Sequence, residues 1–192
     1  ADTRQQVPGL SLALMALLLA MAAHIGVSTM VSSFRLTFTG FLDQRLTAGL
    51  YVATDHAAQA EAFLAFVEPR VDGVLPLLST GTRLAGQKAE ILGLRVGPAY
   101  RDNWTFIAED GAVWDRVAAG EAVIINEQMA RRADLWPGDR LALAPGRALP
   151  IAGVVSDYGN PIGQAVVGEV LFAELFPEIR ATRFGLRSQD PD

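Results

Sequence analysis

The side chains most able to bind a metal ion or to attack a substrate are scarce in this sequence. There is no cysteine, which excludes a disulfide scaffold, a thiol nucleophile and cysteine-ligated zinc. The two histidines, His24 and His56, are 32 positions apart and belong to no HExxH or similar motif. The histidine pattern therefore predicts no metal site.

Motifs for nucleophilic catalysis and for phosphate binding are also missing. No serine lies in a GxSxG elbow, and no GxxxxGK[ST] loop is present, so the chain does not bind ATP in the P-loop manner. The carboxylates of Glu127, Asp139 and Asp157 lie near predicted turns, where such side chains usually cap backbone N–H groups. We expect no catalytic, cofactor-binding or metal-binding residue, and no cofactor.

The most distinctive loop is DYGNPIGQ (157–164), which contains two glycines and an Asn-Pro pair. Glycines in such a run are typical of a turn that requires positive φ angles. A ligand-binding loop is the alternative, and we favour the turn.

The charge balance argues against a nucleic-acid-binding protein, and the hydropathy is higher than expected for an ordinary soluble domain. The chain of 192 residues has 16 basic and 21 acidic residues and a formal charge of -5. An acidic chain is not expected to bind nucleic acid, because that affinity depends on basic residues facing phosphate. The hydrophobic fraction of 51% and the mean hydropathy of +0.26 are slightly high for a soluble domain.

The excess hydrophobicity is concentrated near the N-terminus. Residues 5–34 carry no formal charge, and 10–23 are almost entirely Leu, Ala and Met, which favour helix. A bilayer core about 30 Å thick requires roughly 20 apolar residues in a helix. We therefore predict a retained transmembrane helix. A cleaved signal peptide and a buried core helix are the alternatives.

This helix is predicted to continue beyond the membrane. Over about 8–48 it would be about 60 Å long, roughly twice the hydrocarbon thickness. Its outer half would be an amphipathic stalk, and a surface helix packed on its own domain is a compatible interpretation. The apolar face of the stalk consists of Phe34, Phe38, Phe41 and Leu42.

The remaining chain predicts an α+β fold with the element order β-α-β-β-α-β, a ferredoxin-like order. The final helix and strand are separated from the first four elements by a β-rich insertion with Gly-containing turns. The expected elements are a strand at 50–54, a helix at 56–68 capped by Asp55, strands at 74–84 and 89–97 joined by a turn at 85–87, a helix at 167–177 and a strand at 181–187.

The insertion is expected to form a small, partly open β-module. It would contain an irregular aromatic segment from 100, a strand at 122–125, a short helix capped by Asn126, and strands around the hairpin turn at 144–147. The expected domains are 1–47 (helix and stalk), 48–97 with 165–192 (ferredoxin-like subdomain) and 98–164 (inserted subdomain).

All three tryptophans lie in or beside the insertion. Trp104, Trp114 and Trp136, with Phe106, are expected to form its core, because aromatic side chains contribute large buried areas. The alternative is an exposed surface for an apolar substrate or an outer partner protein.

Three segments together resemble FtsX/MacB-like ABC transporter permeases. The first segment, similar to the end of a transmembrane helix and the first strand of their periplasmic core domain, is HIGVSTMVSSFRLTFTGFLDQRLTAGLYV (24–52). A later strand and loop of that domain are similar to LPIAGVVSDYGNPIGQ (149–164). The third segment, 120–143, has the sequence GEAVIINEQMARRADLWPGDRLAL. It resembles their G-x-A-V-I-I-x-E-x-x-A-x-x-x-x-L-x-x-G-D-x-L pattern. The matching positions there are Gly120, Glu127, Leu135, Gly138 and Asp139.

The resemblance implies a permease subunit of the bacterial inner membrane, with the residues after about 35 in the periplasm. It implies a cytoplasmic ATP-binding subunit, a second permease copy or homologue and membrane lipid as partners, and no catalytic residue in this chain. The first helix would couple ATP hydrolysis to conformational change outside the membrane, for export or extraction of a lipophilic substrate. We expect the sequence to be a fragment of a longer permease.

Two other functions remain open from the residues alone. One is a membrane-anchored periplasmic binding or adaptor module without a transport role. The other is a secreted hydrolase, which the missing catalytic motifs make the least favoured of the three.

Overall fold

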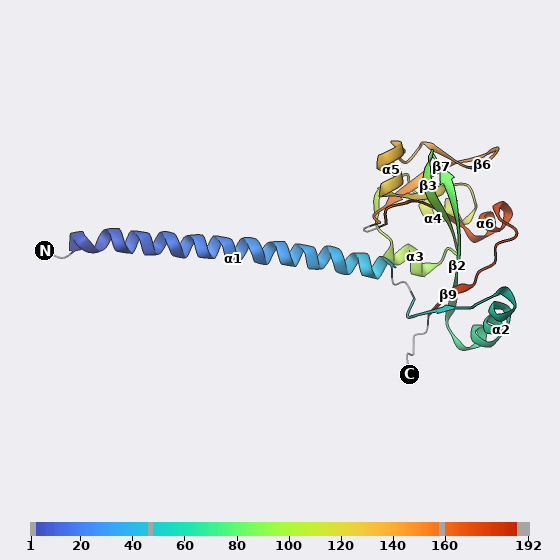
Figure 1. The fold of residues 1–192 in the computed structure, drawn as a ribbon, viewed down its shortest axis with the longest axis horizontal. Coiled ribbons are helices and arrows are strands. Elements are labelled where there is room, and N and C mark those ends of the chain that lie inside the picture. Colours follow the sequence, from blue (N-terminus) through green and yellow to red (C-terminus); the bar gives the residue numbers. More distant parts are fainter. Residues whose placement is uncertain (1–2, 46–47, 158–159, 188–192) are drawn as a thin grey trace. The chain divides into compact units, whose positions relative to one another are not determined.

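The computed structural model describes residues 3–45, 48–157 and 160–187. The chain separates into two compact units, Ala1–Leu42 and Asp43–Asp192. We call the second one the globular unit. Figure 1 shows the first unit as a single long helix and the globular unit as helices around a twisted sheet.

Helix α1 (Thr3–Arg45) contains 43 residues and begins earlier than the sequence suggested. It is the one helix among the described residues that is long and apolar enough to cross a membrane, over Ser11–Gly40, with a mean hydropathy of 2.0. None of that segment is buried, whereas the core helix of a soluble protein is mostly buried. This finding argues against the core-helix alternative.

The predicted apolar face of α1 is only partly described. Phe34 and Phe38 are exposed and stack on each other, with ring centroids 5.8 Å apart. The side chains of Phe41 and Leu42 lie outside the described residues. Packing of this face against the globular unit or against a partner stays a prediction.

The globular unit contains the predicted β-α-β-β and α-β segments with an insertion between them. The segments outside the insertion are β1 (Leu50–Ala53), α2 (Ala57–Val67), a 3-10 turn (Glu68–Arg70), β2 (Gly73–Leu84), β3 (Gln87–Leu94), α6 (Glu169–Leu175) and β9 (Arg183–Arg187). The insertion contains α3 (Pro98–Asn103), β4 (Phe106–Glu109), α4 (Val113–Ala118), β5 (Val123–Asn126), α5 (Glu127–Ala133), β6 (Arg140–Ala144), β7 (Arg147–Val155) and β8 (Gly163–Gly168).

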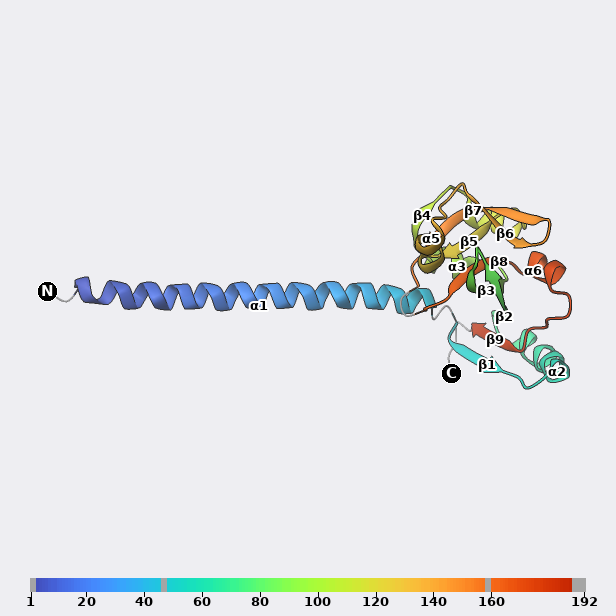
Figure 2. The ribbon, with the colours of Figure 1, turned by 45° about the horizontal axis from the view of Figure 1, so that its top comes forward.

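Nine strands of the described chain form one mixed sheet in the order β1-β9-β2-β3-β8-β5-β7-β4, with β6 paired to β7. Figure 2 shows β1 and β9 at one end of the globular unit, and β4 and β7 at the other. Strand β9 is antiparallel to both β1 and β2, so β1 and β2 are parallel with β9 between them. This split β-α-β arrangement agrees with the predicted α+β fold class.

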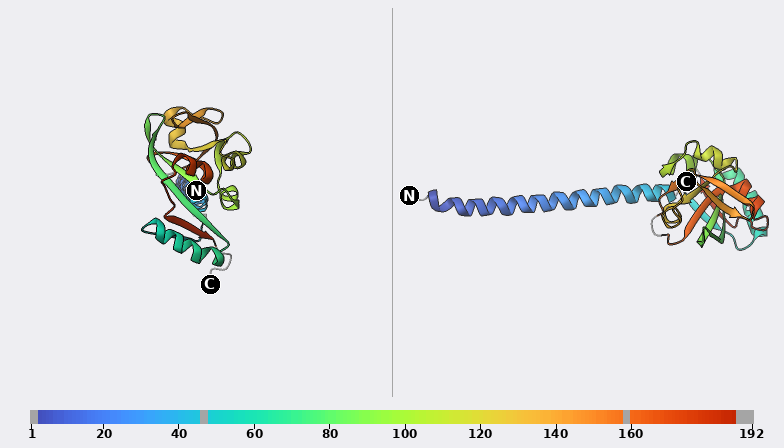
Figure 3. Two further views of the ribbon diagram at one scale, coloured as in Figure 1. Left: turned by 90° about the vertical axis from the view of Figure 1, so that its right-hand side faces the viewer. Right: turned by 90° about the horizontal axis from the view of Figure 1, so that it is seen from above.

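Strand β2 joins two halves of this sheet. Its first part, Gly73–Leu77, pairs with β9, and its second part, Leu77–Leu84, pairs with β3. The left panel of Figure 3 shows β2 crossing the length of the globular unit, with α2 beside β9 at one end. The β1/α2/β9 half is therefore connected to the rest of the sheet through a single strand.

The prediction was wrong for parts of the insertion. The segment from 100 was expected to be irregular, but it contains α3 and β4, and neither α4 nor β8 was predicted. Strand β8 also crosses the expected boundary at 164/165 and pairs with β3 and β5. One continuous sheet contains strands from both expected subdomains. The division into subdomains itself stays a prediction.

Helices cover both faces of this sheet. Val123 and Ile125 of β5 belong to a core that also contains Met129 of α5 and Phe172 of α6. Ile124 belongs to a second core, which is covered by α3 and α4. Successive strand residues point to opposite faces, so these helices enclose β5 from both sides. A third, smaller core lies under α2.

The aromatic side chains of the insertion contribute to the second of these cores. Trp114 is buried, Trp104 and Phe106 are half-buried, and the rings of Trp104 and Trp114 are 5.5 Å apart. Trp136 is half-buried against the core that contains Phe172. No tryptophan of the globular unit is thus largely exposed, which supports the core interpretation and not the aromatic contact surface.

Tyr100 of α3 lies in the same cluster and is 4% exposed. Burial raises the pKa of Tyr100 to about 12, and the charge of Tyr51 makes a smaller contribution in the same direction. The folded protein therefore favours the neutral hydroxyl of Tyr100. Between about pH 10 and pH 12 the hydroxyl ionises in the unfolded chain but not in the folded one, so the free energy of unfolding falls as the pH rises.

We expect Tyr100→Phe to remove this part of the alkaline loss of stability. Between pH 9 and pH 11.5, the free energy of unfolding of the wild type should fall by about 2 kcal/mol more than that of the variant. Urea unfolding followed by circular dichroism at both pH values measures the difference. A difference between the two proteins that does not change with pH would contradict the assignment to Tyr100.

Candidate functional site

The two histidines have unrelated positions. His24 lies on the exposed surface of α1. His56 is the N-cap of α2, where its Nδ1 accepts a hydrogen bond from the Gln59 backbone N–H at 3.2 Å. The predicted cap, Asp55, is wrong: its backbone N–H instead donates to Gln59 Oε1 at 2.7 Å. The described residues contain no group of three or more His, Asp or Glu side chains arranged to hold a metal ion.

The carboxylates near turns have local partners. Glu127 forms an ion pair with Arg131 one turn later in α5, with an N–O distance of 2.7 Å. Asp139 Oδ2 accepts a hydrogen bond from the Trp136 backbone N–H at 2.9 Å. Asp139 therefore accepts from a backbone N–H as its position near a turn predicted, whereas Glu127 pairs with a guanidinium instead of a backbone N–H.

Asn126 organises a buried polar network at the end of β5. Its Oδ1 caps α5 as predicted, accepting from the Met129 N–H at 3.1 Å, and also accepts from the Gln164 N–H at 2.9 Å. Its Nδ2 donates to Asp157 Oδ2 at 3.2 Å and to the Ile162 carbonyl at 3.0 Å. Asn126 is 1% exposed, so one amide connects β5, α5 and both ends of the distinctive loop.

The distinctive loop is also held by contacts of its own. Asn160 donates to Asp157 Oδ2 at 2.7 Å, and Arg132 donates to the Pro161 carbonyl at 2.6 Å. The prediction that the glycines of this loop take positive φ angles is wrong at Gly163, which lies in β8 and has no positive φ. A Cβ there would lie 2.7 Å from Met129 Cε, so close packing accounts for this glycine. Gly159 lies outside the described residues. The turn interpretation of this loop stays a prediction.

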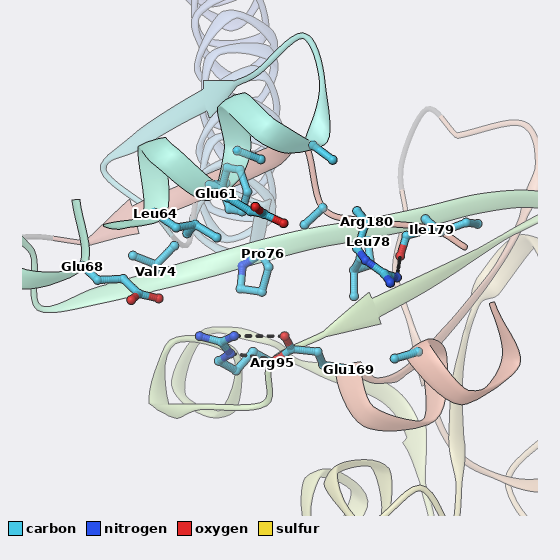
Figure 4. A pocket seen from close by; sticks show the side chains of 15 residues that line it. Glu61, Leu64, Glu68, Val74, Pro76, Leu78, Arg95, Glu169, Ile179 and Arg180 are labelled. Carbon is cyan, nitrogen blue, oxygen red and sulfur yellow. Dashed lines mark hydrogen bonds and ion pairs between the residues drawn. The ribbon is translucent and has the colours of Figure 1, made fainter. Parts of the chain in front are cut away.

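A groove between α2 and α6 was not predicted from the sequence. Its volume is about 250 Å³. Val74, Pro76 and Leu78 of β2 line one side, and Ala60 and Leu64 of α2 line another. Figure 4 shows the α2 side chains on one side of β2, and Arg95 and Glu169 on the other. The small residues in α2 and the proline in β2 were visible in the sequence, but their positions around one groove depend on the pairing of β2.

An ion pair borders the α6 side of this groove. Arg95 donates from Nε and Nη2 to the two carboxylate oxygens of Glu169, at 2.7 and 2.9 Å. The hydrogen bond to Glu169 raises the pKa of Arg95, and the charge of Glu68 on the opposite side adds to this effect. Because Arg95 follows β3 and Glu169 begins α6, the pair fixes the start of α6 beside the end of β3.

No protein-family model matches the sequence, and no curated protein sequence matches it. The fold, however, is similar to that of two solved structures. One is the extracellular domain of the noncanonic ABC-type transporter YknZ from Gram-positive bacteria, with a TM-score of 0.52 and 16% identity over 74% of this chain and 83% of that one. The other is the periplasmic region of MacB from Actinobacillus actinomycetemcomitans, with a TM-score of 0.51 and 14% identity over 73% of this chain and 68% of that one.

At these identities the comparisons establish the fold. The globular unit has the α+β fold of extracytoplasmic domains of ABC transporter permeases, as the resemblance of the three sequence segments to MacB-like permeases implied. The long apolar helix precedes this fold in the chain.

Proposed function

We propose that this chain is the extracytoplasmic domain, with its preceding transmembrane helix, of an ABC transporter permease subunit of the bacterial inner membrane. A cytoplasmic ATP-binding subunit would supply the energy, and a second permease would complete the transporter. The observation that carries the proposal is the fold shared with the YknZ and MacB domains, directly after an apolar helix with no buried residue in its candidate span.

The proposed role of the globular unit is mechanical. Helix α1 continues for 43 residues without interruption, and a continuous helix transmits displacement that a flexible Gly/Ser linker would absorb. Its end is followed within a few residues by β1, which belongs to the half of the sheet that β2 alone joins to the rest. Movement of α1 would therefore open the globular unit between its two halves.

Site-directed spin labelling tests this proposal, and this chain has no cysteine of its own that would also be labelled. Cysteines introduced at two exposed positions, Ala65 of α2 and Ala118 of α4, place one spin label in each half. The complete permease with its ATP-binding subunit, reconstituted in nanodiscs, is then measured with and without ATP and vanadate. We expect the distance between the labels to change on trapping.

A substitution in α1 distinguishes coupling from other sources of movement. Thr37 is exposed, and within the described part of the chain its hydroxyl bonds only the Ser33 carbonyl, at 3.0 Å. Thr37→Pro should interrupt the helix and abolish the distance change while ATP hydrolysis continues, because an interior proline costs about 3 kcal/mol and bends a helix. Thr37→Ala is the matched control and should behave as the wild type. A distance change that persists in Thr37→Pro would exclude transmission through α1, and no change in any protein would favour an anchored adaptor module.

A further inference from the structure

The groove between α2 and α6 has the chemistry of a site for a side chain of another protein. Its lining is mainly apolar, including Leu64, Val74, Leu78 and Ile179. Its volume of about 250 Å³ is below the roughly 300–1,000 Å³ of most small-molecule pockets. A groove of this size suits one or two anchoring side chains of a polypeptide better than a complete lipophilic ligand.

The charges around the groove are not balanced between its two sides. On the α6 side, Glu169 is neutralised by its two hydrogen bonds to Arg95. On the α2 side, Glu61 and Glu68 are exposed, and neither has a hydrogen bond or ion pair among the described residues. Glu68 is attracted by the charge of Arg95, but the hydrogen bonds of Arg95 go to Glu169. Glu61 lies in α2, and Glu68 begins the 3-10 turn that follows this helix, so the two carboxylates border the groove from successive elements.

The remaining basic side chain at the groove does not offset these carboxylates. Arg180 donates to the backbone carbonyls of Pro177 and Ile179, in its own loop. Figure 4 shows Arg180 directed toward that loop, and Glu61 and Glu68 apart from each other with Leu64 between them. The side of the groove formed by α2 and the 3-10 turn after it therefore presents an apolar wall between two carboxylates.

We infer that this groove binds a segment of a partner protein in which apolar anchoring side chains are flanked by lysine or arginine. The apolar side chains would lie over β2, and the flanking cations would lie beside Glu61 and Glu68. This inference does not depend on the coupling role proposed above, since an anchored adaptor module would use the same groove.

A short peptide of this chemistry provides the probe. Acetyl-Lys-Leu-Trp-Leu-Lys-amide is titrated into the full chain in phosphatidylcholine nanodiscs, with Ile, Leu and Val methyl groups labelled for NMR. We expect chemical-shift changes that saturate and that are concentrated at Leu64, Val74, Leu78 and Ile179. The peptide with Glu in place of Lys should bind at least fivefold more weakly. Changes spread over the whole globular unit, or equal binding of the two peptides, would overturn the inference.

Charge-neutral variants test the two carboxylates. Glu61→Gln with Glu68→Gln should weaken binding of the basic peptide about fivefold, a modest effect because exposed ion pairs are weak. Glu109→Gln with Glu121→Gln removes two exposed carboxylates outside the groove lining and should leave binding unchanged. Equal weakening in both double variants would indicate a general effect of net charge and would overturn the site.

A filled groove tests the apolar part of the inference. Ala173 of α6 lines the groove and is exposed, so Ala173→Trp adds an indole ring without replacing a buried side chain. Binding should be lost while the thermal midpoint stays within a few degrees of the wild type. Undiminished binding in this variant would overturn the location. Shifts at the same methyl groups with dodecylamine, but not with the peptide, would replace the protein segment by a lipophilic cation.

Discussion

Asn126→Ala is expected to destabilise the globular unit by about 4 kcal/mol. The amide oxygen accepts from the backbone N–H groups of Met129 and Gln164, and alanine leaves both donors in a buried site without that acceptor. A buried donor without its partner costs about 1–3 kcal/mol, and loss of a helix cap costs about 0.5–2 kcal/mol. The bonds from Nδ2 to Asp157 and Ile162 are lost as well.

Tryptophan fluorescence during guanidinium unfolding measures this effect. All three tryptophans are in the globular unit, so the signal reports this unit without interference from α1. Asn103→Ala is the control, because Asn103 is half-buried and its side chain makes a single hydrogen bond among the described residues, to the Ala99 carbonyl. It should lose about 1 kcal/mol or less. Similar losses in the two variants would mean that the Asn126 network contributes little beyond one hydrogen bond.

Gly168→Ala is expected to destabilise the same unit by about 3 kcal/mol. Gly168 ends β8 and precedes α6, with an ordinary φ of -65° that alanine adopts without strain. A Cβ at this position would lie 2.6 Å from the Val117 carbonyl oxygen. That oxygen belongs to the backbone of α4, so relief requires a shift of the helix or of the strand, and such overpacking costs about 1–3 kcal/mol or more.

Gly81→Ala is the matched control for the added methyl group. Gly81 lies in β2, and no atom lies within 4 Å of the position that its Cβ would take. Alanine there should leave stability unchanged or raise it by up to about 1 kcal/mol, because glycine is unfavourable within a strand. The same guanidinium experiment compares the two variants. Equal stability would show that α4 and β8 separate easily, contrary to a rigid contact.

Several elements could be predicted because neighbouring residues in the chain determine them. The uncharged run at 5–34 predicts a long helix whatever surrounds it, and α1 includes all of it. The turn between β2 and β3 was predicted from Ala85-Gly86-Gln87, and Ala85 and Gly86 have positive φ angles of 46° and 76°. The cap role of Asn126 was also predicted, because a helix cap bonds its own helix within three residues.

Other elements depend on distant partners and were missed. Strand β8 has six residues, all buried, and its short sequence GQAVVG has no alternation that marks a strand. It is a strand because β3 and β5 supply hydrogen bonds on its two sides. Helices α3 and α4 have six residues each, too few to be stable alone, and packing on the sheet stabilises them.

The sequence by itself therefore determined the apolar helix, the α+β class, the main turns and the acidic character of the chain, since these follow from local pattern and composition. Only the tertiary structure decided that Asn126 joins β5 to the 157–164 loop, and that Glu61 and Glu68 lie opposite the Arg95–Glu169 pair. The physical reason is the exchange of partners along β2, from β9 to β3, which sets the positions of α2 and α6 on either side of one groove. The hairpin of β2 and β3 is local, but β2 and β9 are about a hundred positions apart, and pairing over that separation leaves no signature in the local sequence.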